Sequence, residues 1–120
     1  GEHASYESWA SIVSGYDATS SGEYGYASVL GGWRNTASNQ GSVVVGGDAN
    51  VASGGFAVVV GGNGNEAEST ESVVVGGDGN ASSHFNATVL GGRNNEASGQ
   101  FSVVYAGNGN TATSLDSYAP

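Results

Sequence analysis

One short stretch of the chain holds the residue types of a hydrolase triad. His84 follows Ser82 and Ser83, and Asp78 lies a few residues upstream. Nucleophilic catalysis needs a serine bonded to a base that a third group orients, and closeness in sequence supplies no such orientation. Serine is also common throughout this chain. We therefore interpret the stretch as part of a structural unit and expect no enzymatic activity.

Two glycine-rich segments contain residues that could ligate calcium. Gly-Gly-Asn-Gly-Asn at 61–65 and Gly-Gly-Asp-Gly-Asn at 76–80 are similar to nonapeptide repeats that bind calcium between the coils of a β-roll. The period here is longer, and asparagines replace the aspartates which that motif needs. Acidic residues instead recur in every second unit, as at Asp48 and Asp78, which spreads like charges apart. We expect no cofactor, with calcium binding as the alternative.

A third group of residues has the chemistry of a surface-binding patch. Tyr16, Trp33 and Arg34 follow glycines at places where other units carry Asp or Asn. At turns, such side chains could form an exposed patch for a sugar or a host molecule. The phenylalanines lie at or next to the boundaries between units, and we expect them to fill corners or seams between chains: Phe56, Phe85 and Phe101.

All these residues belong to a strict internal repeat of 15 residues, marked by recurring glycine pairs that Ala106-Gly107 continues. Corresponding positions form columns. One column is valine: Val29, Val44, Val59, Val74, Val89 and Val104. Another is glycine: Gly32, Gly47, Gly62, Gly77, Gly92 and Gly107. A third is asparagine: Asn35, Asn50, Asn65, Asn80, Asn95 and Asn110. A column of small residues follows: Ala37, Ala52, Ala67, Ser82, Ala97 and Ala112.

The repeat predicts an all-β fold. Fifteen residues are too few for a helix-turn-helix unit, and β-branched valines favour strands. We predict a parallel β-solenoid, or β-roll, of about seven coils stacked roughly 4.8 Å apart. The repeat domain is expected at 10–113, regular from about 27, after a partial opening coil at 1–9 and before a tail at 114–120. Residues 11–15 match the unit at a 17-residue step, which places two extra residues within 21–25.

The glycine and asparagine columns have a structural interpretation. We expect glycine where a Cβ would obstruct the backbone at the end of each strand. Asparagine tolerates a positive φ at a corner, and stacked amides can form a hydrogen-bonded ladder along the axis. These columns therefore predict turns that hold neighbouring coils together.

The valine-rich strand carries a prediction about partners. In Val43-Val44-Val45 the outer two side chains point to one face and Val44 to the other, yet both faces are apolar. A thin coil can bury only one face, and six exposed valines would each forgo about 1.5–3 kcal/mol. We expect a second surface, a copy of the same chain, to cover the Val44 column. The alternative is that both faces are internal to one chain.

Composition limits the other partners. The 120 residues carry a formal net charge of −9, and the cationic side chains are Arg34 and Arg93. This charge repels nucleic acids and anionic membranes. There is no cysteine, and no apolar run approaches the roughly 20 residues of a membrane span. The sequence does not begin with methionine, so it is either processed or an excerpt from a longer chain. Processing fits removal of a secretory signal, and we expect an extracellular or cell-surface protein.

The unit resembles the head repeats of trimeric autotransporter adhesins, which are found on bacterial surfaces. The resemblance rests on Ser-x-Val-Val-Gly followed by an Asn- and Ala-containing segment and then glycine, as in 42–54, and covers most of the chain from about Ala10. It implies two short strands per coil, left-handed winding and three chains around one axis. One face of the valine-rich strand would then fill the coil, and the other would meet neighbouring chains.

These observations predict a non-enzymatic structural protein that self-assembles into a fibre, a sheath or an adhesin head, as a trimer or an extended polymer. Neither end shows the polar or helical cap of a monomeric solenoid, which predicts end-to-end growth. The alternative is a binding module that recognises a host surface or a glycan through exposed turn residues. Ice binding is disfavoured because the threonines share no long column.

Overall fold

The computed structural model describes residues 3–5, 11–21 and 25–120 of the chain. In this part the chain forms short strands joined by turns, and none of these residues is helical. The strands alternate between two sheets, so that each coil contributes one strand to each. Sheet A contains β1 His3–Ser5, β3 Ala18–Ser20, β5 Thr36–Ala37, β7 Val51–Ala52, β9 Glu66–Ala67, β11 Ala81–Ser82, β13 Glu96–Ala97 and β15 Thr111–Ala112. Sheet B contains β2 Ser11–Ile12, β4 Ser28–Val29, β6 Val43–Val44, β8 Val58–Val59, β10 Val73–Val74, β12 Thr88–Val89, β14 Val103–Val104 and β16 Tyr118–Ala119.

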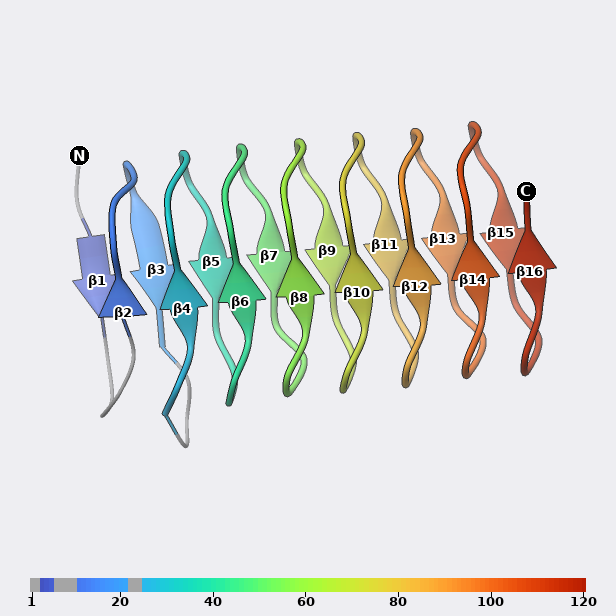
Figure 1. The fold of residues 1–120 in the computed structure, drawn as a ribbon, viewed down its shortest axis with the longest axis horizontal. Helices are drawn as coiled ribbons and strands as arrows, with labels where there is room; N and C mark the ends of the chain where they lie inside the picture. The colour runs from blue at the N-terminus through green and yellow to red at the C-terminus, as the bar shows by residue number, and fades with distance from the viewer. Residues whose placement is uncertain (1–2, 6–10, 22–24) are drawn as a thin grey trace.

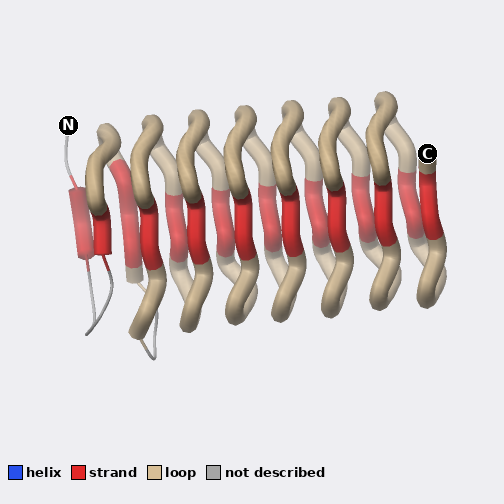
Figure 2. The backbone as a smooth tube through the Cα atoms, viewed as in Figure 1, coloured by secondary structure: helices blue, strands red, loops and turns tan. Residues whose placement is uncertain are grey.

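The two sheets lie face to face along a flat rod of about seven coils (Figure 1). Its principal extents are 37 × 25 × 12 Å. Every strand pair is parallel, and turns at both edges carry the chain from one sheet to the other (Figure 2). In Figure 1 the nearer strands point up and the farther strands point down while the chain advances to the right, so the winding is left-handed. The predicted all-β parallel solenoid is confirmed.

The register reproduces the sequence repeat. Val44 pairs with Val59 at a 15-residue step, whereas Thr19 pairs with Thr36 at a 17-residue step. The two extra residues therefore lie between β3 and β4, around the segment 21–25 where we expected them. The end of the repeat differs from our expectation. Tyr118 pairs with Val103 in sheet B, so 114–120 continues the solenoid instead of forming a separate tail.

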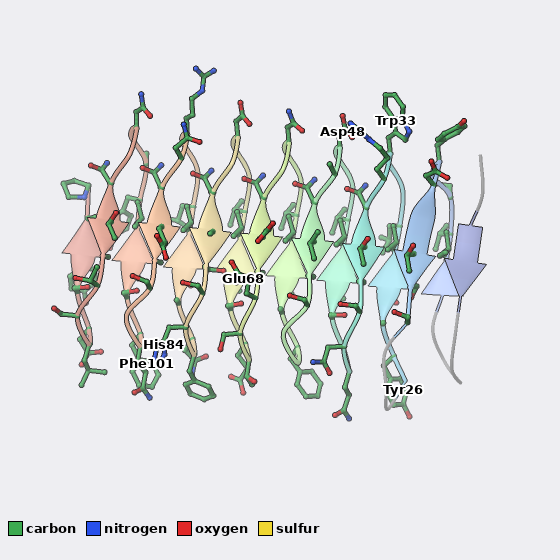
Figure 3. The ribbon with its side chains drawn as sticks, turned by 180° about the vertical axis from the view of Figure 1, so that it is seen from behind. Tyr26, Trp33, Asp48, Glu68, His84 and Phe101 are labelled. Atoms are coloured by element: carbon green, nitrogen blue, oxygen red, sulfur yellow. The ribbon has the colours of Figure 1, made fainter. Side chains whose placement is uncertain are left out.

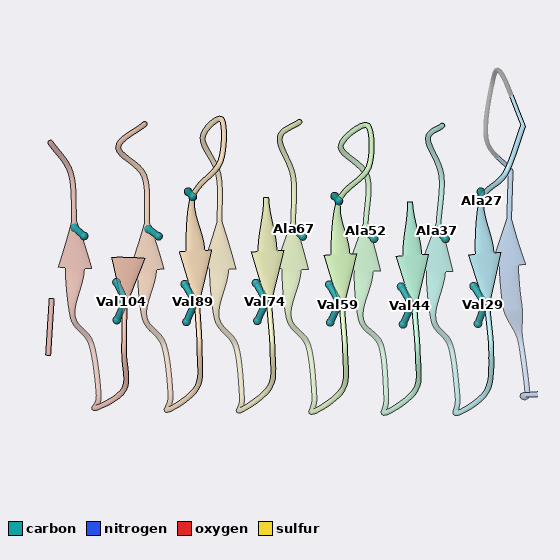
Figure 4. Close-up of a cluster of buried hydrophobic side chains, with 14 of the residues drawn as sticks. Ala27, Val29, Ala37, Val44, Ala52, Val59, Ala67, Val74, Val89 and Val104 are labelled. Carbon is teal, nitrogen blue, oxygen red and sulfur yellow. The ribbon is translucent and has the colours of Figure 1, made fainter. Parts of the chain in front are cut away.

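The core is a single layer between the sheets (Figure 4). The valine column of sheet B is fully buried, and it faces the alanine column of sheet A. A rod only 12 Å thick has room for valine opposite alanine, but not for two large side chains. The chain therefore buries the Val44 column by itself. Our expectation that a second surface must cover this column was wrong, and the outward face of sheet B is built by its neighbours Val43 and Val45.

The small-residue column contains one buried hydroxyl that lacks a hydrogen-bond partner, at Ser82. The Ser82 hydroxyl is buried and makes no hydrogen bond, while its paired neighbours in sheet A are Ala67 and Ala97. Leaving a hydroxyl unpaired in the interior costs about 1–3 kcal/mol. We predict that Ser82→Ala raises the free energy of unfolding by about 1 kcal/mol in urea denaturation.

A buried serine with partners provides the control. The Ser72 hydroxyl donates to the Ser69 carbonyl at 2.7 Å and accepts from the Ser69 N–H at 3.1 Å. Ser72→Ala is therefore expected to lower stability. If Ser82→Ala also lowered it, the Ser82 hydroxyl would have a partner in solution.

Candidate functional site

The glycine column lies where each coil touches the next. Gly62 has φ +90°, and a Cβ there would lie 2.2 Å from the Gly77 carbonyl oxygen. It would also lie 2.6 Å from the Asn65 amide nitrogen. A Cβ added to Gly61 would have no heavy atom within 4 Å. The prediction that a Cβ would obstruct this turn is thus confirmed for the second glycine of each pair, and Ala106 occupies the first place in the last pair.

The asparagine column is buried and bonds to the backbone of both its own coil and the next. The Asn65 amide nitrogen donates to the carbonyls of Gly61 at 2.9 Å and Gly77 at 3.0 Å. The Asn65 amide oxygen accepts the backbone N–H of Asn80 at 2.9 Å. A ladder along the axis is present, although it joins side chain to backbone and does not join amide to amide.

The asparagines do not occupy the positive-φ corner that we expected. That conformation belongs to the residue before each of them, as at Arg34, Ala49 and Asn94. Asparagine is required instead because its amide supplies both a donor and an acceptor to buried backbone groups. The column therefore stabilises the stack through hydrogen bonds. In the candidate calcium segment 76–80, the Asn80 amide oxygen accepts from Asn95 N–H at 2.9 Å.

The three residues of the expected surface patch do come together. The Tyr16 and Trp33 rings meet edge to face with centroids 5.9 Å apart, and the Arg34 guanidinium lies 4.7 Å from the Trp33 ring centroid. Tyr16 and Trp33 each leave about half of their surface exposed. We call Tyr16, Trp33 and Arg34 the tryptophan patch. It lies at the turn that leads from sheet B to sheet A (Figure 3).

An ion pair that the sequence analysis missed holds this patch in place. The Arg34 guanidinium donates to both carboxylate oxygens of Asp48 at 2.9 Å. Asp48 belongs to the next coil, in the column that also holds Trp33. Arg93 lies 3.8 Å from Asp78 in the same column, so each arginine reduces the repulsion that Asp48 and Asp78 would otherwise exert. The sequence signal that could have revealed these ion pairs was the placement of opposite charges at neighbouring positions of adjacent coils.

The outward face of sheet B carries a row of apolar side chains along the whole described length. Val45, Val60 and Val75 each expose 40–42% of their surface. The row, which we call the outer apolar row, contains Val13, Leu30, Val45, Val60, Val75, Leu90 and Tyr105. Half-buried valines flank it, as at Val43 and Val58. The row ends in Tyr105, whose ring stacks on Tyr118 with centroids 6.3 Å apart.

The outward face of sheet A is polar. Glu66 and Glu96 lie in one exposed column, with Glu68 beside them. Burial raises the pKa of Glu68, and the neighbouring charge of Glu66 and its hydrogen bond to Glu68 raise it further. Within the described residues no group of three or more acidic or histidine side chains is arranged to hold a metal ion.

The residue types of a hydrolase triad lie apart. The Ser82 hydroxyl faces the interior, whereas Asp78 is exposed in the column of Trp33. His84 lies at the opposite edge of the rod, where its Nδ1 accepts the Phe85 N–H at 2.8 Å (Figure 3). The Ser83 hydroxyl donates to Glu96 Oε1 at 3.2 Å, so none of these four residues shows the bonded serine and histidine pair that a triad needs.

The fold places this chain among the parallel β-solenoid repeat proteins. No protein-family model matches the chain, and no curated protein is significantly similar to it. The fold is established, but the resemblance to the heads of trimeric adhesins therefore stays a prediction in every other respect. In the described part of the chain, no helix is present that could cross a membrane.

Proposed function

We propose that this chain is a non-enzymatic structural protein of the cell surface or extracellular space that assembles with copies of itself. The assembly would be a fibre, a sheath or an adhesin head, built as a trimer or as an extended polymer. The observation that supports this proposal is the outer apolar row. It offers copies of the chain a flat, continuous surface for packing.

The two outward faces of the rod differ in chemistry. Sheet A presents exposed glutamates and hydroxyls, as at Glu66 and Thr111, which suit contact with water. Sheet B presents valine, leucine and tyrosine side chains in one contiguous row. Soluble proteins rarely leave extended apolar strips uncovered, and such strips mark interaction surfaces. The contrast within one small rod favours an interface on sheet B.

The nature of the row favours a second copy as the partner. The row is straight, follows the rod axis and repeats at every coil, so an identical row can pack against it over its whole length. It contains no charged side chain, which avoids the cost of burying an unpaired charge between copies. Among the described residues, the charged side chains lie outside this row, which limits repulsion between rows of like chains.

A charge in the outer apolar row should disrupt the assembly. We predict that the unaltered chain sediments as an oligomer or polymer and that Val60→Lys raises the dissociation constant at least about tenfold, because an ammonium group would be buried without a partner. Analytical ultracentrifugation over a concentration series measures the change.

Val51→Lys is the control, since Val51 is a half-buried valine that faces outward from sheet A and not from sheet B. Its sedimentation should equal that of the unaltered chain. Chains that remain monomeric at high concentration would contradict the proposal, as would equal effects of the two lysines.

The tryptophan patch supports the alternative of a binding module for a host surface or a glycan. Trp33 and Tyr16 are held at right angles, and Arg34 is fixed between Trp33 and Asp48. Such fixed, exposed aromatic groups lose little entropy on binding. Trp33→Ala is expected to lower binding to cells or glycan arrays at least about tenfold without changing assembly.

The control is Asn63→Ala, two coils further along the same exposed column. Equal binding by the parent chain and both variants would remove the tryptophan patch as a binding site.

A further inference from the structure

The edge of the rod opposite the tryptophan patch carries bulky residues in an unfavourable backbone conformation. At one turn position of successive coils φ is positive, and the residues there include Phe56 (φ 58°), Asn86 (φ 56°) and Phe101 (φ 59°), with Gly41 (φ 63°) in the same column. Glycine and asparagine adopt this region readily, whereas a large side chain there is strained. Since Gly41 and Asn86 show the unstrained solution, the phenylalanines call for another reason.

Burial within the chain does not supply that reason. Phe56 and Phe101 leave 54% and 43% of their surfaces exposed. The Phe56 ring lies over Gly41, because a Cβ added to Gly41 would be 2.4 Å from the ring. Phe101 meets Phe85 edge to face with centroids 6.0 Å apart. Each ring is thus held in place from one side and remains open to solvent on another. The turn imposes this conformation in other coils as well, as at Glu71 and Asp116, so what sets Phe56 and Phe101 apart is a large apolar ring that stays exposed there.

Three of the rings recur at a regular interval, and a fourth, Phe101, lies one coil beyond Phe85. From Tyr26 to Phe56, and from Phe56 to Phe85, the step is two coils. At the spacing of hydrogen-bonded strands, two coils span about 10 Å. We call these three residues and Phe101 the aromatic edge. Tyr26 and Phe101 lie on the same side of the rod in Figure 3, and Trp33 lies on the other. The aromatic edge therefore runs parallel to the rod axis and is separate from the tryptophan patch.

Polar side chains lie between the rings. The coil between Phe56 and Phe85 carries Thr70 and Glu71 at this turn, and Gln40 and Gln100 occupy the same turn of other coils. Rings that alternate with hydrogen-bonding groups are suited to a ligand that presents apolar faces and hydroxyls in alternation. Two flat apolar protein surfaces packed together would leave these polar groups without partners.

We propose that the aromatic edge binds a neutral, extended, β-1,4-linked polysaccharide laid along the rod. Pyranose rings in such a chain present flat faces of C–H groups that stack on aromatic rings, while their hydroxyls reach neighbouring polar side chains. The chain is straight and repeats every two sugars, a length close to two coils of the solenoid. The net charge of −9 and the exposed Glu71 disfavour polyanionic glycans at this edge.

The test uses the full chain with cellohexaose and chitohexaose in calorimetry and with microcrystalline cellulose and chitin in pull-down. Phe56→Gly and Phe101→Asn place at each site a residue already found in that column, so folding is preserved. We expect the parent to bind at least one of these four probes, each variant to bind about tenfold more weakly, and the double variant to show no binding. Asn63→Ala, at the opposite edge of the rod, should bind like the parent, and dextran should not be bound.

Three results would overturn the proposal. One is that the parent binds none of the four probes, and another is that the double variant binds them as the parent does. The third is that the double variant loses self-association while the parent binds no glycan, which would make the aromatic edge an interface between copies. Because the outer apolar row is tested by Val60→Lys, failure here would leave the assembly proposal standing.

Discussion

The Gly62→Ala variant is expected to lose at least about 3 kcal/mol of unfolding free energy, one of the largest losses available from a single methyl group in this protein. Gly62 is at φ +90°, where a side chain is strained, and the added Cβ would lie 2.2 Å from the Gly77 carbonyl oxygen. That oxygen belongs to the next coil, where it also accepts the Asn63 N–H. Relief of the clash would require the two coils to separate.

Gly61→Ala is the matched control one residue earlier. No heavy atom lies within 4 Å of a Cβ added to Gly61, and the last glycine pair of the repeat already has Ala106 there. Its stability should stay within about 0.5 kcal/mol of the parent. Urea denaturation followed by circular dichroism compares the two variants. Equal losses in the two variants would contradict the close approach of Gly62 to the Gly77 carbonyl oxygen.

The second large effect concerns the asparagine ladder, where Asn65→Ala should cost about 2–4 kcal/mol of unfolding free energy. The substitution leaves the buried N–H of Asn80 without its acceptor and the Gly61 carbonyl without its amide donor. It also opens a cavity between the sheets, because Asn65 is fully buried. Hydrogen exchange should show the Asn80 amide losing protection before those of distant coils.

Asn63→Ala provides the comparison, since Asn63 is exposed two residues away on the same turn. Its side chain makes no contact on which the stacking depends, and its loss should change stability by less than about 0.5 kcal/mol. A small effect of Asn65→Ala would mean that backbone pairing alone holds the coils in register.

The sequence predicts the fold because the same residues must stack on themselves in every coil. The 15-residue step determined the strands, their parallel register and the extra residues near 21–25. It could not determine which face of Val43-Val44-Val45 is internal, because both faces are apolar. The answer depends on the opposite sheet, where the small-residue column at Ala52 and Ala67 leaves space for the Val44 column alone.

The candidate sites were predicted less completely. Tyr16, Trp33 and Arg34 could be grouped because they share a phase of the repeat, whereas the ion pair from Arg34 to Asp48 depends on how side chains cross between coils. Phe56, Phe85 and Phe101 could be grouped as residues near the unit boundaries, but the sequence did not show that Phe56 and Phe101 leave about half of their surfaces exposed. The positive φ of Phe56 and Phe101 likewise could be seen only in the structure, because no simple sequence pattern predicts it at phenylalanine.

Electron cryomicroscopy of the full chain, concentrated without additives, tests the proposed self-assembly most directly. The account predicts oligomers or filaments in which strands stack about 4.8 Å apart and sheet B of one chain packs against another copy through the outer apolar row. Discrete trimers and long polymers both satisfy this prediction. Single rods, or assemblies in which Val45, Val60 and Val75 face solvent, would contradict it.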